Sequence, residues 1–241
     1  YHEPFVGGGA LFFALRTQGL LDDGACLSDV NARLIEAYQG VANHLDEVIA
    51  LLREHADRHS TEYFYATRSV EPATLPERAA RLIYLNRTCF NGLYRENSQG
   101  RFNVPIGRYV NPTICDEPTL RAASRALQGV DLSARPFDRV LEAARPGDLV
   151  YFDPPYVPLT TTASFTAYAQ DGFSMADQAR LAVVCATLAD RGVHVMLSNS
   201  KTDPVMELFA RFRIDIVQAA RAVNSRADRR GKVDEVVVTS F

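Results

Sequence analysis

The stretch "DLVYFDPPY", Asp148–Tyr156, decides how this chain folds. Its first part, Leu149–Phe152, is a short apolar run of the kind that forms a strand buried in a sheet. Two adjacent prolines follow Asp153, and proline can neither continue a central strand nor lie in the interior of a helix. We therefore predict that a buried strand ends here in a stiff, extended turn that carries Asp153 and Tyr156.

Outward from this strand, the apolar patterns alternate between those of strands and those of helices. Before it, "VGGGALFFAL" predicts a turn and a helix, "ACLSDVN" a strand ending at Asp29, and the pattern from Asn31 to about His55 is helical. After it, "SMADQARLAVVCATLADRG" predicts a helix capped by Ser174, and "VHVMLSNS" predicts a buried strand. A short helix, "PVMELFA", and two closing strands, "FRIDIVQA" and "DEVVVTS", complete an α/β sheet with helices on both faces.

The segment from about Glu47 to Leu127 interrupts this alternation. It holds helical patterns and one hairpin-like stretch, "FNGLYRENSQGRFNVPIGRY", with turn signals at Asn91-Gly92 and Gln99-Gly100. We therefore expect one α/β domain made of residues 1–46 and 128–241. Residues 47–127 would form an inserted, mostly helical domain that carries the hairpin.

Composition sets broad limits on the function. The 241 residues are 47% apolar with a formal net charge of −3, which suits a globular chain and does not by itself indicate a nucleic-acid binder. No apolar run reaches the length of a membrane span, no signal peptide is expected, and none of the four cysteines forms a CxxC pair, so we expect a cytoplasmic chain. His55 and His59 have the spacing of metal ligands but no third ligand nearby, so no metal site is predicted.

In an open α/β sheet, ligands bind beyond the carboxyl ends of the strands. Gly7, Gly8 and Gly9 let the backbone approach a ligand, although they equally suit a simple turn into a helix. Asp29 could accept hydrogen bonds from both hydroxyls of a ribose, or cap the next helix. Because the glycines lack the pattern of a dinucleotide or triphosphate site, the two features together indicate an adenosine-containing ligand without a pyrophosphate.

The turn at the end of "DLVYFDPPY" suits the methylation of an aromatic amine. The lone pair of such a nitrogen is delocalised into its ring, and two acceptors that bind its two N–H groups would free the lone pair on one side. The Asp153 carboxylate is one acceptor, and the carbonyl of Pro154, held rigid by Pro155, is the other. Tyr156 offers a face for stacking a base. The alternative is a proline turn with Tyr156 in the core.

At these residues the sequence resembles the Dam-type DNA adenine methyltransferases. "EPFVGGGALFFAL" is similar to the cofactor motif of that family, "LSDVNARLI" to its ribose-binding motif and "DPPY" to its catalytic motif. "YLNRTCFNGLYRENSQGRFNVPIGRY" resembles its DNA-recognition segment, "TTASFTAYAQDGFS" the loop over its active site, and "LSNS" a later strand motif. Family members carry a Lys- and Gly-containing segment before the cofactor motif. We expect either that the given sequence starts inside the protein or that this segment is absent.

The resemblance implies a Rossmann-like class I methyltransferase fold with a mixed seven-stranded sheet. It also implies S-adenosylmethionine as cofactor, a flipped adenine in double-stranded DNA as substrate, GATC as target, and a bacterial or phage origin. The residues that it assigns to catalysis are Asp153, Pro154, Pro155 and Tyr156. The residues that it assigns to the cofactor are Glu3, Pro4, Phe5, Gly7, Gly8, Gly9, Asp29, Val30 and Asp153.

Two runs of basic residues suggest where DNA would lie. Residues 78–108 hold six arginines and one acid, and residues 221–232 hold five basic residues and one acid. A two-stranded ribbon fits the major groove, where Arg95 could bind guanine while Leu93 and Pro105 contact thymine methyl groups. The family assigns Phe90 and Asn91 to the gap that the flipped base leaves. The full set of expected DNA contacts is Arg87, Phe90, Asn91, Leu93, Arg95, Asn97, Pro105, Arg108, Asn224 and Arg229.

Other interpretations of the sequence remain open. The segment "PLTTTASFTAY" is either a lid that orders on DNA or a static loop. The acceptor could be the amine of cytosine or an amide in protein or RNA, or the chain could be a DNA-binding module that has lost catalysis. We expect a monomer that needs no metal and no membrane.

Overall fold

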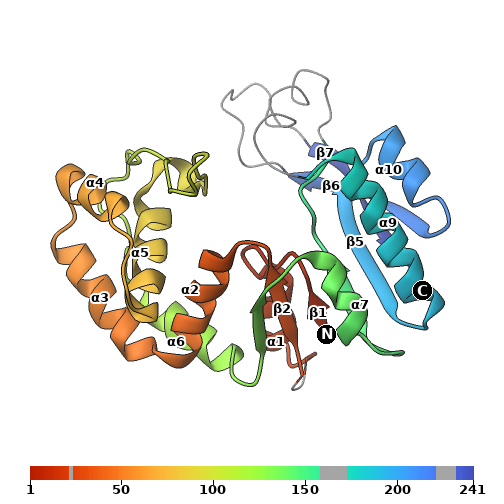
Figure 1. Cartoon of the computed structure of the whole chain (residues 1–241), viewed down its shortest axis with the longest axis horizontal. Coiled ribbons are helices and arrows are strands. Elements are labelled where there is room, and N and C mark those ends of the chain that lie inside the picture. The colour runs from red at the N-terminus through yellow and green to blue at the C-terminus, as the bar shows by residue number, and fades with distance from the viewer. Residues whose placement is uncertain (22–23, 158–172, 221–231) are drawn as a thin grey trace. The chain divides into compact units, whose positions relative to one another are not determined.

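The computed structural model describes residues 1–21, 24–157, 173–220 and 232–241. Within these residues, seven strands form one sheet in the order β3-β2-β1-β4-β5-β7-β6. Figure 1 labels β1, β2, β5, β6 and β7 among them. The strands are β1 (His2–Glu3), β2 (Cys26–Asp29), β3 (Asp131–Ala134), β4 (Leu149–Phe152), β5 (His194–Ser200), β6 (Arg213–Ala220) and β7 (Lys232–Thr239). The predicted α/β fold with a mixed seven-stranded sheet is confirmed.

The strand directions bring the predicted strand ends to one edge. β1 is parallel to β2 and β4, and β4 is parallel to β5, whereas β7 is antiparallel to both β5 and β6. The carboxyl ends of parallel strands point the same way. Pro4 after β1, Val30 after β2 and Asp153 after β4 therefore follow strands that end on the same edge of the sheet.

The chain divides into two compact units. The first contains residues 1–8, 25–30 and 135–241, and the second contains residues 9–24 and 31–134. The described helices of the first unit are η2 (Phe137–Arg139), α7 (Val140–Ala143), α9 (Met175–Asp190) and α10 (Asp203–Leu208). Those of the second unit are α1 (Ala10–Thr17), α2 (Ala32–Asn43), α3 (Leu45–Asp57), α4 (Thr61–Ser69), α5 (Leu75–Thr88), η1 (Phe90–Gly92) and α6 (Glu117–Ala126). These units do not test whether residues 47–127 act as an inserted recognition domain, so that assignment stays a prediction.

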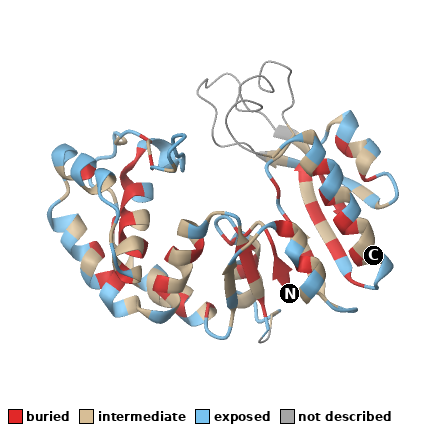
Figure 2. Ribbon diagram, in the orientation of Figure 1, coloured by how far each residue is buried: buried red, intermediate tan, exposed pale blue. Residues whose placement is uncertain are grey.

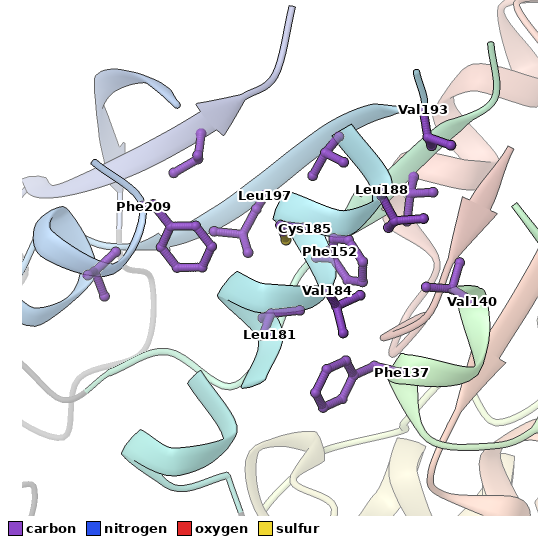
Figure 3. Packing of buried hydrophobic residues seen from close by; sticks show 14 of the residues in the cluster. Phe137, Val140, Phe152, Leu181, Val184, Cys185, Leu188, Val193, Leu197 and Phe209 are labelled. Carbon is purple, nitrogen blue, oxygen red and sulfur yellow. The ribbon is translucent and has the colours of Figure 1, made fainter. Parts of the chain in front are cut away.

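Helix α9 anchors the core of the first unit. It starts as predicted at Ser174, whose hydroxyl accepts from the Asp177 amide while Asp177 bonds back, and it stops before Gly192, which has a φ of 81°. Figure 3 shows its apolar side chains against those of β4 and β5. The cluster includes Phe152, Leu181, Val184, Cys185, Leu188 and Leu197, all almost fully buried. Burying one such large apolar side chain contributes about 1.5–3 kcal/mol, so this packing holds the end of β4 firmly in place.

The second unit differs from the sequence prediction at one point. The helix expected from Asn31 to about His55 is two helices, because His44 adopts non-helical dihedral angles (φ −135°, ψ 37°) between α2 and α3. Both helices pack on α5, whose buried residues run along one side (Figure 2). At the closest point a Cβ added to Gly40 would lie 2.4 Å from the Cβ of Ala79. The missing side chain at Gly40 therefore lets α2 and α5 approach each other.

His55 and His59 serve packing within the described part of the second unit. Nδ1 of His55 lies 2.8 Å from the hydroxyl of Tyr63, and Nδ1 of His59 lies 2.9 Å from that of Tyr84. The His55 ring also stacks on the Tyr84 ring, with centroids 4.7 Å apart. Among the described residues no group of three or more metal-binding side chains occurs, and the histidine spacing is explained by these aromatic contacts.

Candidate active site and DNA-recognition hairpin

The glycine turn after β1 is fastened to the end of β2. The Val6 amide donates to the Ser28 carbonyl at 3.0 Å, and the Gly7 amide donates to Oδ2 of Asp29 at 3.2 Å. Gly7 has a φ of 46°, a conformation that suits glycine. A Cβ added to Gly8 would meet no atom within 4 Å, so the backbone here can be approached closely. These are the features that a nucleoside-binding turn needs.

Two alternatives for this region can now be judged. The helix after β2 is capped by Asn31, whose Oδ1 accepts from the amides of Arg33 and Leu34, so capping is not the task of Asp29. Gly9 does have a structural role, since it is the left-handed N-cap residue of α1. A Cβ there would lie 3.1 Å from both Phe13 and Tyr38, within the second unit.

The remaining residues predicted to bind cofactor differ in exposure. Val30 is 78% exposed, which is unusual for valine and leaves an apolar surface beside Asp29. Glu3 and Pro4 are buried, and the hydroxyl of Tyr1 donates to Oε2 of Glu3 at 2.7 Å. Burial, together with the Glu3 carboxylate, raises the pKa of Tyr1. Glu3 therefore lies within the sheet, below the turn that it precedes.

Phe5 belongs to an aromatic cluster that the sequence did not reveal. Its ring stacks on Phe137 with centroids 5.3 Å apart and meets Phe173 edge-on at 5.5 Å. Phe137 is 4% exposed and packs on α9 side chains (Figure 3). Because Phe137 and Phe173 come from segments more than a hundred residues away, no local sequence pattern could have identified them. The cluster fixes the chain just before the glycine turn.

The predicted acid is held in place by β5. Because Phe152 pairs with Leu197, Asp153 lies beside Ser198, whose hydroxyl donates to Oδ1 of Asp153 at 2.5 Å. The hydroxyl of Tyr151 lies 3.1 Å from the same Ser198 oxygen. Asp153 itself is exposed, so its carboxylate is oriented from one side and accessible from the other.

Tyr156 has a neutral phenol over the usual working range of an enzyme. Burial raises its pKa well above the ordinary value, the nearby Asp153 charge raises it further, and a hydrogen bond with Ser198 opposes the shift. Burial raises the pKa of Tyr151 in the same way. The uncharged, half-buried ring of Tyr156 is suited to stacking on a planar base.

The two prolines of the turn have different hydrogen bonding. The Pro155 carbonyl accepts from Nε2 of Gln178 at 3.0 Å, and the Val157 amide donates to Oδ1 of Asn199 at 3.2 Å. The Pro154 carbonyl accepts no hydrogen bond from any residue that the structure describes. Pro154 itself is buried, and its carbonyl oxygen is not used as an acceptor within these residues, as the role that the sequence suggested for it beside Asp153 requires.

The predicted hairpin is formed, but not as a regular ribbon, and its role in DNA recognition stays a prediction. Only two isolated antiparallel bridges, Cys89 with Ile106 and Glu96 with Phe102, join its arms in the described residues. The first turn is η1, where Asn91 and Gly92 have φ values of 54° and 61°. Nδ2 of Asn86 donates to the Gly92 carbonyl at 2.7 Å and supports this turn from α5. Irregular backbone, rather than a strand ladder, defines the shape of the hairpin.

The predicted DNA contacts of the hairpin and of the last turn of α5 are exposed. Those within the described residues are all exposed, namely Arg87, Phe90, Asn91, Leu93, Arg95, Asn97, Pro105 and Arg108. Oδ1 of Asn97 also accepts from the amides of Gln99 and Arg101, so part of that side chain shapes the tip. Nε of Arg95 donates to Oδ1 of Asn103 at 2.7 Å, which leaves the terminal guanidinium nitrogens for another partner. The predictions for Asn224, Arg229 and the segment "PLTTTASFTAY" fall outside the described residues.

Arg33 is a further residue that sequence reasoning missed. Its Nη1 donates to Oε1 of Glu96 at 2.8 Å and to the Gly100 carbonyl at 2.6 Å, and its Nη2 lies 3.2 Å from Oε1 of Glu71. Arg33 thereby ties the hairpin tip to the helices of the same unit. Arg33 lies in the first turn of α2, far from the hairpin in the sequence, so no local pattern predicted this contact.

Comparison with known proteins decides the family. The model of the D12 class N6 adenine-specific DNA methyltransferases matches residues 1–223 of the chain. The chain belongs to this family. It is 40% identical to the type II methyltransferase M1.LlaDCHI of Lactococcus lactis subsp. cremoris, over all of this chain and 86% of that protein. It is 34% identical to the DNA adenine methylase of Escherichia coli K12, over 98% of this chain and 84% of that protein.

A phage protein is also similar to this chain. The DNA N-6-adenine-methyltransferase of Escherichia phage P1 is 36% identical over 98% of this chain, which covers 31% of that longer protein. As a member of the family, this D12 class chain is an adenine-specific DNA methyltransferase, so its partner is DNA and its reaction needs a methyl donor. Its α/β sheet is that of a class I methyltransferase. In the described part of the chain, no helix is long and apolar enough to cross a membrane.

Proposed function

We propose that this chain transfers a methyl group from S-adenosylmethionine to the N6 amine of an adenine that is flipped out of duplex DNA, within the sequence GATC. The observation that supports this most directly is the turn after β4. There the exposed Asp153 carboxylate is oriented by Ser198, and the Pro154 carbonyl accepts no hydrogen bond from a described residue. The two acceptors thus lie in consecutive residues, and no salt bridge to Asp153 occurs among the described residues.

The residues at the carboxyl ends of β1 and β2 fit S-adenosylmethionine. The Asp29 carboxylate, already oriented by the Gly7 amide, would accept from the ribose hydroxyls. The open backbone at Gly8 and the exposed side chain of Val30 would flank the nucleoside. When bound, this cofactor supplies an electrophilic methyl group on a sulfonium. The absence of a glycine-rich phosphate loop agrees with a cofactor that has no phosphate.

The chain's own groups would prepare the amine for attack. Asp153 and the Pro154 carbonyl would each accept one N–H of the adenine N6 group. Their pull favours a pyramidal nitrogen whose lone pair is no longer delocalised into the ring and points along the direction of transfer. Most of the rate gain would come from positioning and from fixed acceptors at the reacting amine.

The base must leave the helix for this geometry to form. In a duplex the N6 amine is paired and stacked, so an enzyme that acts on it takes the base out of the stack. The neutral ring of Tyr156 would then offer a stacking surface, worth roughly 1–3 kcal/mol by comparison with other base–aromatic stacks. This compensates for part of the cost of unstacking.

The proposed GATC target rests on the hairpin. Its sequence from Tyr84 to Tyr109 resembles the recognition segment of the Dam-type enzymes, and the structure presents Leu93, Arg95 and Pro105 as exposed side chains. Arginine that binds the O6 and N7 atoms of guanine is the commonest specific contact in the major groove. Five of the similar proteins carry the name DNA adenine methylase, which is consistent with a short adenine-containing target.

The proposal can be tested by transfer of a labelled methyl group from S-adenosylmethionine to short duplexes. We expect label in a duplex with one GATC and none in a matched duplex with GTTC or with GATC already methylated on both adenines. Asp153→Ala should reduce kcat by about a hundredfold or more, because a fixed charge at the reacting group is lost. Glu62→Ala, at an exposed acid on α4, is the matched control. Equal labelling of the GTTC duplex would refute the target, and an active Asp153→Ala variant would refute the catalytic role.

The base contact is tested separately. Arg95→Ala should cost about 1–3 kcal/mol at one base pair and relax the preference there, while the other positions keep theirs. Relative rates on duplexes that differ from GATC at a single position measure this. An unchanged preference at every position would remove Arg95 from base reading.

A further inference from the structure

Gln178 is a buried polar residue in the apolar face of α9. Its side chain is 1% exposed and lies one turn before Leu181 in the core cluster. Both ends of its amide are used, since Nε2 donates to the Pro155 carbonyl at 3.0 Å and Oε1 accepts from Nδ2 of Asn199 at 3.2 Å. Burying an amide without partners is costly, so a residue of this kind in an apolar face is there for its hydrogen bonds.

Asn199 extends the network along the turn. It is fully buried in β5, and its Oδ1 accepts from the Val157 amide at 3.2 Å and from the Ser200 amide at 2.8 Å. The Ser200 hydroxyl donates to the Val157 carbonyl. Every hydrogen bond that the structure shows to Pro155 or Val157 therefore comes from α9 or from the end of β5.

The turn needs these contacts from α9 and β5 because its own backbone cannot supply the hydrogen bond that would close it. Pro154 and Pro155 have no N–H groups, so neither can form the hydrogen bond that closes an ordinary turn. The orientation of the Pro154 carbonyl depends on the peptide that follows it, and Gln178 holds that peptide by its oxygen. Gln178 satisfies the carbonyl of Pro155 and leaves that of Pro154 without a described donor. Helix α9 thus binds one of two adjacent carbonyls and leaves the other free of described donors.

We propose that Gln178 is the positioning residue of the catalytic turn, acting through Pro155 and Asn199 to aim the Pro154 carbonyl at the adenine amine. The inference rests on the proposed function of Asp153–Tyr156 in the site described above. Because Gln178 is 1% exposed, its side chain acts through the residues that it binds, Pro155 and Asn199. It sets kcat, and contributes little to the binding of either substrate.

Gln178→Glu provides a variant whose hydrogen bonding depends on pH. A protonated glutamic acid can donate to the Pro155 carbonyl and accept from Asn199, as glutamine does, whereas the carboxylate has no donor and would repel that carbonyl. Burial raises the pKa of a carboxyl group, which brings the change into a measurable range. We expect the ratio of kcat for Gln178→Glu to kcat for the unaltered chain to fall about tenfold or more between pH 5.5 and pH 8.5, because misplacement at the site slows transfer.

Two further variants complete the experiment. Gln178→Met keeps the size of the side chain without its hydrogen bonds and should have a low kcat at every pH. Val183→Glu adds a carboxylate to α9 at a position that is 65% exposed, and its kcat ratio should not change with pH. All variants are assayed as the full chain on the GATC duplex, and kcat is expressed per folded protein from the near-ultraviolet circular dichroism at each pH. A purely structural role would lower the folded fraction and leave this kcat unchanged.

The outcomes separate this inference from the proposed function. A pH-dependent kcat ratio for Gln178→Glu, with the KM values for DNA and S-adenosylmethionine within about twofold of the unaltered chain, supports it. A ratio that does not change with pH, or a change in KM alone, overturns it. If Gln178→Met does not fold, the glutamate variant still decides, since its acid form keeps the network. Asp153→Ala is measured in the same assay, because its activity tests the catalytic role of the turn independently of the result for Gln178.

Discussion

Tyr84 shows what one buried phenol contributes to the second unit. Its ring is fully buried in α5, stacks on His55, and its hydroxyl lies 2.9 Å from Nδ1 of His59. Burial, with a smaller contribution from Tyr63, raises the pKa of Tyr84 to about 12. The stability of the helices that support the hairpin should therefore fall at alkaline pH, where this phenol can lose its proton.

The direction of this effect follows from proton binding. Below pH 10 both the folded and the unfolded chain keep the Tyr84 proton, whereas between pH 10 and 12 only the folded chain does. The contribution of Tyr84 to the free energy of unfolding is thus complete below pH 10. Between pH 10 and 12 it falls by about 1.4 kcal/mol for each pH unit. We predict that Tyr84→Phe is less stable than the unaltered chain by about 1 kcal/mol at pH 8, where it lacks one hydrogen bond.

The difference between the two proteins should disappear as the pH approaches 11, because the phenylalanine variant has no proton to lose. Urea unfolding at pH 8, 9, 10 and 11 measures this. Tyr65→Phe, which alters an exposed ring in the neighbouring helix α4, is the control and should follow the unaltered chain throughout. A constant difference between Tyr84→Phe and the unaltered chain across this range would contradict the prediction.

At the scale of elements, the contact between α2 and α5 depends on one missing side chain. A Cβ on Gly40 would lie 2.4 Å from that of Ala79, which is far closer than two carbon atoms can approach. Alanine in a helix is favoured over glycine by about 1 kcal/mol, but overpacking a core costs about 1–3 kcal/mol. We predict that Gly40→Ala lowers the free energy of unfolding of the second unit, as measured by urea denaturation.

A second substitution tests the cause. Gly40→Ala combined with Ala79→Gly moves the methyl group from one helix to the other and should recover most of the lost stability. The coupling between the two sites should exceed about 0.5 kcal/mol, as expected for residues in contact. Additive effects would mean that the two Cβ positions do not compete for the same space.

The elements themselves were largely predictable from the sequence. Helix α9 begins and ends where its serine cap and its glycine indicate, and the end of β4 follows from its two prolines, because these signals act on the local backbone. The break at His44 was not predictable, since no glycine or proline marks it. The sequence also suggested a two-stranded ribbon where the structure has isolated bridges, because turn residues determine where a chain reverses but not how many ladder bonds form.

The site was predictable only in part. Glycines, an acid after a strand and the proline turn can be read locally, and the structure places Gly7, Asp29 and Asp153 at the ends of the expected strands. The residues that support them, such as Phe137 and Gln178, come from distant segments and depend on packing. Gln178 did leave a signal, because it occupies a position on the apolar face of α9 where a leucine would otherwise be expected.

At the scale of the whole molecule, the net charge of the chain is negative, whereas the proposed DNA contacts lie in a positively charged segment. The chain has a net charge of −3, whereas residues 78–108 hold six arginines and one acid. DNA binding should therefore depend on where positive charge lies rather than on its total. Phosphate contacts release counterions, so the affinity for DNA should fall steeply as salt is added.

We predict that Arg87→Gln and Arg108→Gln each reduce the slope of log K against log salt concentration by about 1, for duplexes of any sequence. Arg139→Gln makes the same change in net charge at an exposed arginine of η2, and should leave the slope unchanged. Fluorescence anisotropy with a labelled duplex at four salt concentrations gives the slopes. Equal effects of all three substitutions would show that net charge, and not the hairpin, controls binding.

The irregular hairpin also bears on how target specificity can evolve. Its shape comes from Asn91, Gly92 and Gly100, which have positive φ values, and from backbone hydrogen bonds, whereas side chains such as Leu93 and Pro105 are exposed. Mutations at exposed positions such as Leu93 and Pro105, whose side chains form no hydrogen bonds, should be nearly neutral for folding, so a lineage can sample new recognition sequences by single substitutions. The same freedom does not extend to Asn91, where a β-branched residue would be strained. Diversity among descendants of this chain should therefore be high at the reading positions and low at the turns.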